Sequence, residues 1–211
     1  MKIILDGMGG DNAPFSVVEG AVLASRQTQH HICIIGQEEL IIPELKKYKY
    51  ESEKISVINA TQVISNDDAP VRAVRSKKDS SIVKGINMVK NGEGDIFISA
   101  GSTGALLAGG LFILGRIQGI DRPALASVYP IVGGIPSLLV DAGANADCKP
   151  NNLLEFGIMG NIYMEKVIGR KDPKVGLVNI GAEAAKGSTL TKAAYDLLEQ
   201  SHLNFIGNVE A

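Results

Sequence analysis

The sequence predicts an α/β fold built on a mostly parallel sheet, and two features indicate it. Short apolar runs such as Ile3-Ile4-Leu5 and Leu138-Leu139-Val140 lack the polar alternation of a half-exposed strand, so both of their faces should be covered. Longer segments with helical spacing separate these runs along the chain. Strands that alternate with helices of this length indicate parallel strands joined by right-handed crossovers.

The expected elements alternate from the first residues onward. Strands are predicted at Lys2–Asp6, His31–Ile35, Ser56–Asn59, Asp95–Ser99, Ser137–Asp141, Lys174–Ile180 and Asn204–Gly207. Helices are predicted at Pro14–Gln27, Glu38–Tyr48, Ser80–Asn91, Thr103–Arg116, Asn152–Ile168 and Ser188–Gln200. Prolines and a glycine pair between Gly119 and Gly134 predict a hairpin or an irregular excursion from the main sheet.

Local signals support several helix ends. Pro14 suits a helix start, because its missing N–H has no partner to lose there. Asp79 or Ser80 can cap the helix that ends near Asn91, and Ser188 with Thr189 can cap the last predicted helix. These signals fix where the expected crossovers begin.

The composition is that of an ordinary soluble globular protein. Of the 211 residues, 45% are hydrophobic and 21% are charged, and the net charge of −2 gives no signal for nucleic acid. The longest apolar stretch, Ala105 to Leu114, is too short for a bilayer, which takes about 20 residues. No signal peptide is expected, and Cys33 and Cys148 lack metal-binding spacing and fit a reducing cytosol.

Four loops rich in glycine and polar residues follow predicted strands, at the edge where open α/β sheets bind ligands. In the first two, spanning 6–14 and 99–105, glycines allow close backbone approach, and small hydroxyl residues before a helix can form an anion-binding nest. A plain turn is the alternative, and no histidine lies nearby for a Ser-His-Asp triad. The candidate binding residues are Gly9, Gly10, Asp11, Asn12, Ser99, Gly101, Ser102 and Thr103.

The other two loops span 141–150 and 179–188. The third is dense in polar residues, with Asp141 and Asn145 as candidate ligands, and a capped turn is the alternative. In the fourth, Lys186 precedes a glycine and a Ser-Thr helix start, where an ammonium and backbone N–H groups could meet a phosphate. A solvated lysine is the alternative. Spacing alone therefore predicts anion binding and names no reaction.

Taken together, the four loops resemble those of the phosphate acyltransferases of bacterial phospholipid synthesis. The opening Asp6-Gly7-Met8-Gly9-Gly10-Asp11-Asn12-Ala13-Pro14 is similar to the family's Asp-Ala-Met-Gly-Gly-Asp-x-x-Pro. The second signature is similar to 99–105 with Gly119-Ile120-Asp121-Arg122-Pro123-Ala124, the third to Asp141-Ala142-Gly143-Ala144-Asn145, and the fourth to Asn179-Ile180-Gly181 with Lys186-Gly187. The likeness covers the whole chain, although Ala184 and Ala185 stand where the family usually carries glutamate.

The resemblance implies a doubly wound, mostly parallel sheet like that of isocitrate and isopropylmalate dehydrogenases. It implies one α/β region over residues 1–211, incomplete at the C-terminus, in a cytoplasmic homodimer with any membrane contact peripheral. The implied reaction transfers a fatty acyl group from acyl carrier protein to inorganic phosphate, without metal or other cofactor. The alternatives are an acyl-CoA-dependent phosphotransacetylase or phosphotransbutyrylase, a nicotinamide-dependent dehydrogenase, which the missing GxGxxG disfavours, and a non-catalytic scaffold fragment.

The resemblance also implies roles for single residues. Lys186 looks like the family's catalytic lysine, and Asn145 and Asn179 could hydrogen-bond the phosphate or the thioester carbonyl. Asp11 and Asp141 would repel a dianion, so we expect them to orient Lys186 or the loops. An acidic carrier protein implies a basic docking surface, with a plain solvated face as the alternative. The predicted docking residues are Arg72, Arg75, Lys77 and Lys78.

Overall fold

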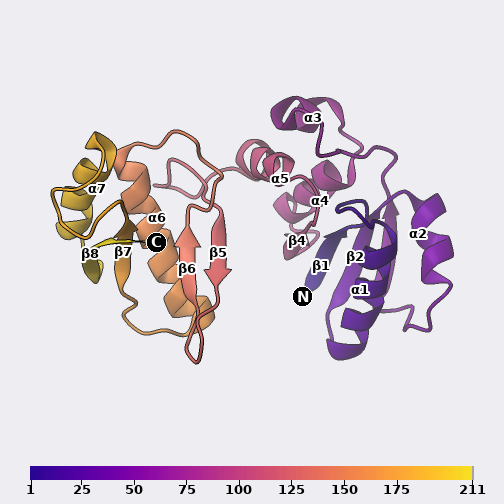
Figure 1. Cartoon of the computed structure of the whole chain (residues 1–211). Coiled ribbons are helices and arrows are strands. Elements are labelled where there is room, and N and C mark those ends of the chain that lie inside the picture. Colours follow the sequence, from indigo (N-terminus) through magenta and orange to yellow (C-terminus); the bar gives the residue numbers. More distant parts are fainter. Residues whose placement is uncertain (211) are drawn as a thin grey trace. The chain divides into compact units, whose positions relative to one another are not determined.

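The computed structural model describes residues 1–210, and the chain falls into two compact units, Met1–Arg116 and Ile117–Ala211 (Figure 1). Each unit has its own sheets and its own buried clusters. The α/β class is confirmed in both, since helices and strands alternate along the chain.

The first unit is built on a four-stranded parallel sheet with the order β3-β2-β1-β4. Its strands are β1 (Lys2–Asp6), β2 (His31–Gly36), β3 (Ile55–Asn59) and β4 (Ile96–Ile98). The chain passes from β1 to β2 and β3 on one side and returns to place β4 on the other. The strand order therefore reverses between β1 and β4, and a crevice at such a point is where α/β sheets bind ligands.

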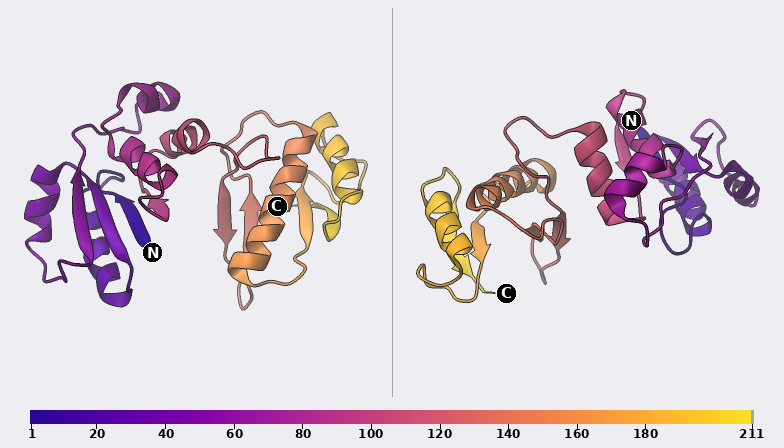
Figure 2. Two further views of the ribbon diagram at one scale, coloured as in Figure 1. Left: turned by 180° about the vertical axis from the view of Figure 1, so that it is seen from behind. Right: turned by 90° about the horizontal axis from the view of Figure 1, so that it is seen from above.

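Helices cover both faces of this sheet (Figure 1, Figure 2). On one face Val18 and Ile41 join Ile34 of β2 in a buried cluster, and on the other Met88 joins Cys33 of β2. Successive residues of β2 thus point to opposite faces, as strand geometry requires. The helical segments of this unit are α1 (Phe15–Gln27), α2 (Glu38–Leu45), α3 (Pro70–Ser76), α4 (Ser81–Lys90), α5 (Thr103–Gly109) and the π-helical turn η1 (Gly110–Leu114).

Two helices of this unit differ from the sequence prediction. The segment Pro70–Ser76 forms α3, which was not predicted. With only 7 residues, this helix is too short to show a repeating pattern of apolar residues. The helix predicted at Thr103–Arg116 divides into α5 and η1 and ends at Gly115, whose φ of 96° cannot continue it. No helix within residues 1–210 is long and apolar enough to cross a membrane.

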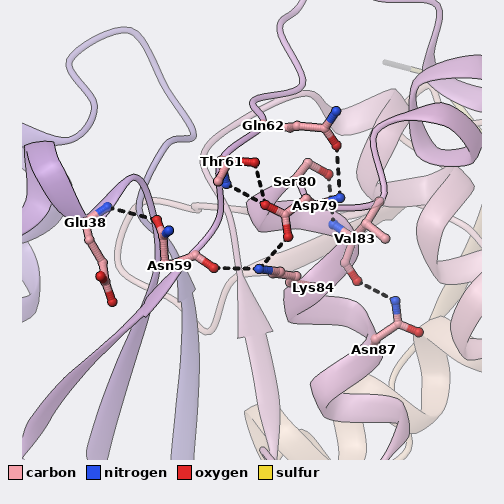
Figure 3. A network of polar contacts seen from close by, with 9 residues as sticks. All are labelled: Glu38, Asn59, Thr61, Gln62, Asp79, Ser80, Val83, Lys84 and Asn87. Carbon is pink, nitrogen blue, oxygen red and sulfur yellow. Dashed lines mark hydrogen bonds and ion pairs between the residues drawn. The ribbon is translucent and has the colours of Figure 1, made fainter.

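A polar network fastens the carboxyl end of β3 to the start of α4 (Figure 3). One oxygen of the Asp79 carboxylate accepts hydrogen bonds from the N–H of Thr61 at 2.8 Å and from its hydroxyl at 2.6 Å. The Lys84 ammonium lies 2.5 Å from the other oxygen and donates to the Asn59 carbonyl at 2.6 Å. Ser80 caps the helix, as one of the two predicted capping residues.

Within the described residues 117–210, the second unit contains two two-stranded sheets and two main helices. Strands β5 (Ala126–Tyr129) and β6 (Ser137–Val140) form an antiparallel hairpin, while β7 (Val175–Val178) and β8 (Phe205–Val209) are parallel. Its helices are α6 (Pro150–Tyr163), the π-helical turn η2 (Met164–Ile168) and α7 (Thr189–Glu199). Leu177, Ala194, Leu198 and Leu203 form its buried cluster.

The stretch from Gly119 to Gly134, predicted to be a hairpin or an irregular excursion, contains β5 and the turn that follows it. The hairpin is completed by β6 at Ser137–Val140, and this pairing corrects one expectation. The strand predicted at Ser137–Asp141 was assigned to the parallel sheet. In the structure β6 pairs antiparallel with β5. The connection between them is short, with Gly133 at a φ of 71° in its turn, and a short turn can join only antiparallel neighbours.

Candidate functional site

The first two predicted loops meet at the carboxyl edge of the four-stranded sheet. Loop 6–14 leaves β1 and loop 99–105 leaves β4, and these two strands are neighbours at the point where the strand order reverses. A Cβ added to Gly9 would lie 2.7 Å from the backbone nitrogen of Gly101. The two loops are therefore in backbone contact, and only glycine leaves room for it.

Asp6 holds these two loops together, and it is a residue that the sequence prediction missed. Its side chain is buried, with the residue 1% exposed. One carboxylate oxygen accepts the N–H of Met8 at 3.0 Å, and the other accepts the Ser99 hydroxyl at 2.6 Å. The Ser99 oxygen in turn accepts the N–H of Gly101 at 3.0 Å. A carboxylate directly after an apolar strand was the available signal, because a buried charge requires partners.

The other predicted ligands of these two loops are exposed or have structural roles. The oxygen of Ser102 accepts the N–H of Ala105 at 3.3 Å and caps α5, so this hydroxyl serves the helix start. The predicted ligands of these two loops that are exposed to solvent remain available to contact a ligand. The exposed residues are Gly10, Asp11, Asn12 and Thr103.

In the second unit, Asp141 organises the third loop. Its carboxylate accepts the N–H groups of Leu125 at 2.7 Å, Ala144 at 3.2 Å and Asn145 at 2.8 Å, and also the Asn145 side-chain amide at 3.2 Å. Partial burial acts to raise the pKa of Asp141, but these hydrogen bonds outweigh it and hold the pKa below its ordinary value. These contacts hold the backbone of the third loop in place.

Two further residues of this loop have defined surroundings. The amide nitrogen of Asn145 also donates to the Pro123 carbonyl at 2.9 Å, so both of its hydrogens are used within the fold. Partial burial, followed by the nearby Asp141 carboxylate, raises the pKa of the Cys148 thiol. A thiol with a raised pKa is a poor nucleophile at neutral pH.

Amide side chains hold the fourth loop in place. Asn208 in β8, 6% exposed, donates to the Glu183 carbonyl at 2.8 Å and accepts from the Asn179 amide at 3.2 Å. Asn179 also donates to the Lys186 carbonyl at 3.1 Å. Asn179 thus fixes the backbone that carries Lys186, while the Lys186 side chain itself is exposed. Asn208 was not predicted, because its role depends on contacts with a segment far away in sequence.

The four predicted docking residues lie on and just after α3, and they differ in their contacts. Lys77 pairs with Asp68 at 2.5 Å and donates to the Val63 carbonyl at 2.8 Å. Lys78 donates to a backbone carbonyl of α3 at 3.3 Å. Lys77 therefore fastens the loop before α3, and its role in docking stays a prediction.

Arg72, Arg75 and Lys78 are the exposed basic residues of this surface. The guanidinium carbon of Arg75 lies 5.4 Å from the centroid of the Phe112 ring, within the range of a cation–π contact. Phe112 is itself 51% exposed. A groove of about 570 Å³ runs beside them, lined by Ala69, Pro70, Val71, Arg72, Arg75 and Ser76.

Comparison with known proteins identifies a matching family and similar proteins. The family model described as "Fatty acid synthesis protein" matches residues 1–211. Two curated proteins named phosphate acyltransferase are similar over the whole chain, at 59% identity in Alkaliphilus oremlandii strain OhILAs and 54% in Clostridioides difficile strain 630. The chain covers only 63% and 62% of their respective lengths.

Among solved structures, a phosphotransacetylase from Streptococcus pyogenes is similar in fold. It matches 100% of this chain with a TM-score of 0.71, at 21% sequence identity, and 68% of that protein is covered. At this level of identity the likeness shows the shared fold.

Proposed function

The chain belongs to the Fatty acid synthesis protein family, and on this premise we propose that the whole protein transfers a fatty acyl group from acyl carrier protein to inorganic phosphate. The product, an acyl phosphate, would supply phospholipid synthesis. The observation that carries the proposal is the identity of 59% and 54% with two proteins named phosphate acyltransferase. The proposal concerns the whole protein, because the chain spans less than two thirds of those relatives.

The proposed reaction needs no covalent enzyme intermediate, and depends on positioning the two substrates and stabilising the charge that develops. Near neutral pH an oxygen of the phosphate dianion attacks the carbonyl carbon of the thioester. The new C–O bond forms, the C–S bond breaks, and the carrier leaves as a thiolate that takes up a proton. Since the phosphate is already nucleophilic and the thioester is activated, positioning both and stabilising the developing oxyanion is sufficient.

Lys186 is the group that we assign to the phosphate or the developing oxyanion. Its exposed side chain stands on a loop whose backbone is held by Asn179 and Asn208, so an accessible ammonium is carried by a fixed backbone. Asn179 then acts as a positioning residue through that loop.

For the carrier protein we assign docking to Arg72 and Arg75 beside Phe112. The paired guanidinium groups suit an acidic partner, and the exposed ring offers apolar area next to them. The proposal further includes a cytoplasmic homodimer with at most peripheral membrane contact, which rests on the family resemblance.

The test is acyl phosphate formation by the full-length protein with the change Lys186→Ala. We expect turnover to fall about 100-fold, because one charge that stabilises the transition state is lost, while the circular dichroism spectrum stays unchanged. Lys192→Ala is the matched control, since Lys192 is also exposed and lies in α7 just after the loop. Near-normal turnover of the Lys186→Ala protein would remove Lys186 from the site.

A second candidate function is acyl transfer between coenzyme A and phosphate. The observation that favours it is the fold likeness to the phosphotransacetylase, with a TM-score of 0.71. The same assay separates the two, because one donor releases carrier-protein thiol and the other releases coenzyme A thiol. Activity with coenzyme A thioesters alone would favour this second candidate, and inactivity with both donors would favour a non-catalytic scaffold.

A further inference from the structure

Helix α3 carries two charged side chains that have no charged partner. Arg72 and Arg75 are both exposed, and neither guanidinium makes a hydrogen bond or an ion pair within residues 1–210. Lys77, just after the same helix, differs because it pairs with Asp68. Residues three apart are neighbours on one helix face, so the two guanidinium groups lie on the same face and repel each other. An anion bound between them removes that repulsion.

The ring of Phe112 restricts one of these two groups. The guanidinium carbon of Arg75 lies 5.4 Å from the centroid of this ring. A guanidinium that rests on an aromatic face keeps the N–H groups along its edge free, and that edge matches two oxygens of a phosphate. Arg75 is therefore oriented in advance for a phosphate, with Arg72 beside it on the same face.

The groove of about 570 Å³ beside these arginines is apolar along the rest of its length. Its apolar lining consists of Ala69, Pro70 and Val71, and Val71 is 43% exposed. None of its six lining residues is acidic, so no side chain of the lining opposes an anion. The groove thus suits a ligand that has a phosphate at one end and an apolar body next to it.

The wall of the groove also touches one of the candidate loops of the same unit. A Cβ added to Gly104 would lie 2.7 Å from Cγ of Pro70, so the first turn of α5 is in contact with α3 there. Gly104 belongs to loop 99–105, which leaves β4 at the point where the strand order of the sheet reverses. A ligand that lies in the groove can therefore extend from the arginines toward this edge of the sheet.

We propose that the groove binds the 4′-phosphopantetheine arm of acyl carrier protein, with the phosphate of the arm held between Arg72 and Arg75. The arm begins with this phosphate, continues with a gem-dimethyl group and amides, and ends at the sulfur that carries the acyl group. The gem-dimethyl group lies against Pro70 and Val71, and the thioester end extends toward loop 99–105.

The choice of the carrier protein rests on the proposed function. Coenzyme A contains the same arm, but it also carries an adenine, and none of the six residues that line the groove is aromatic and could stack on that ring. The proposal gives the two arginines a more specific role than attraction of an acidic protein surface. Attraction of that kind acts on the carrier protein with or without its arm, whereas the groove acts only on the form that has the arm.

Binding of the two forms of carrier protein to the full-length protein tests this difference. The dissociation constants of the holo form, which has the arm, and of the apo form, which lacks it, are measured by fluorescence anisotropy. We expect the parent to bind the holo form at least about 20-fold more tightly, and Arg72→Ala with Arg75→Ala to lower that ratio at least about 10-fold. Lys78→Ala is the matched control, because Lys78 is exposed on the same surface but does not line the groove. It should weaken both forms alike and leave the ratio unchanged.

Each other outcome overturns part or all of the proposal. A ratio that stays at its parental value in the double variant overturns it, as does an equal loss of affinity for both forms, which would place the arginines against the protein surface of the carrier. If coenzyme A displaces the holo form at a lower concentration than free 4′-phosphopantetheine does, the nucleotide is bound as well and the choice of the carrier protein is wrong.

Acyl phosphate formation by the parent, measured in parallel, keeps this proposal separate from the proposed function. A ratio that falls in the double variant supports the groove even if no acyl phosphate forms. An unchanged ratio counts against the groove even if turnover is normal.

Discussion

Gly9 occupies a space in which a larger residue would displace backbone. A Cβ there would lie 2.7 Å from the Gly101 nitrogen and 2.6 Å from a carboxylate oxygen of Asp6. Gly20 is the opposite case, because it is exposed in α1 and nothing lies within 4 Å of an added Cβ. The two positions therefore separate the cost of crowding from the general effect of replacing glycine.

We expect Gly9→Ala to lower the free energy of unfolding by about 1–3 kcal/mol, since the two loops must move apart. Gly20→Ala should raise it by about 0.5–1 kcal/mol, because alanine is the better residue in a helix interior. Urea unfolding followed by circular dichroism measures both changes. A Gly9→Ala protein as stable as the parent would mean that the two loops are not in contact.

The individual residues of the site could be predicted from sequence only where local composition reveals them. The glycines and polar residues that mark the four loops are visible in any short window of the sequence. The role of Asp6 is not, because its partner Ser99 lies 93 positions away. The same holds for Lys77, whose bond to Asp68 becomes apparent only when the loop before α3 is seen folded back on the helix.

Among the elements, α4 depends on its attachment to the end of β3 through Asp79 (Figure 3). Hydrogen bonds from Lys84 and then from Thr61 hold the pKa of Asp79 well below its ordinary value of 3.8. A carboxyl group whose pKa is lowered on folding stabilises the folded state above its unfolded pKa. That stabilisation is lost as the pH falls from 3.8 through the lower folded pKa.

We therefore expect the free energy of unfolding of the parent to fall steeply below about pH 4, and that of Asp79→Asn to fall less over the same range. At neutral pH the variant should be the less stable of the two, because Lys84 and Thr61 lose an ionised partner. Urea unfolding at a series of pH values measures the difference, with Asp67→Asn at another, exposed aspartate as the control. Parallel pH profiles for parent and Asp79→Asn would contradict the role of this network.

The elements of the first unit were the easiest to predict, since a strand buried on both faces gives an unbroken apolar run. β1 agrees with its predicted bounds, and β2 and β3 differ from theirs by one residue. Pairing was harder, because apolar runs do not reveal which neighbour a strand takes. This is why β6 was assigned to the parallel sheet although it pairs antiparallel with β5.

For the whole molecule, the division into two units leads to a prediction about unfolding. Met1–Arg116 contains a complete four-stranded sheet, helices on both faces and three buried clusters. The second unit has one such cluster, two small sheets and a cavity between unpaired strand edges. A domain of about 100 residues with its own core can fold alone, whereas an interrupted sheet is poorly stabilised.

We expect residues 1–116 to fold as an isolated fragment and to unfold cooperatively in urea. In the 211-residue chain, residues 117–210 should unfold at a lower urea concentration than the first unit, giving two transitions. Limited proteolysis at moderate urea gives an independent measurement, and cuts should gather after Arg116 while the first unit survives. A single transition shared by both units would show that they stabilise each other, and a disordered 1–116 fragment would show that the first core is not sufficient.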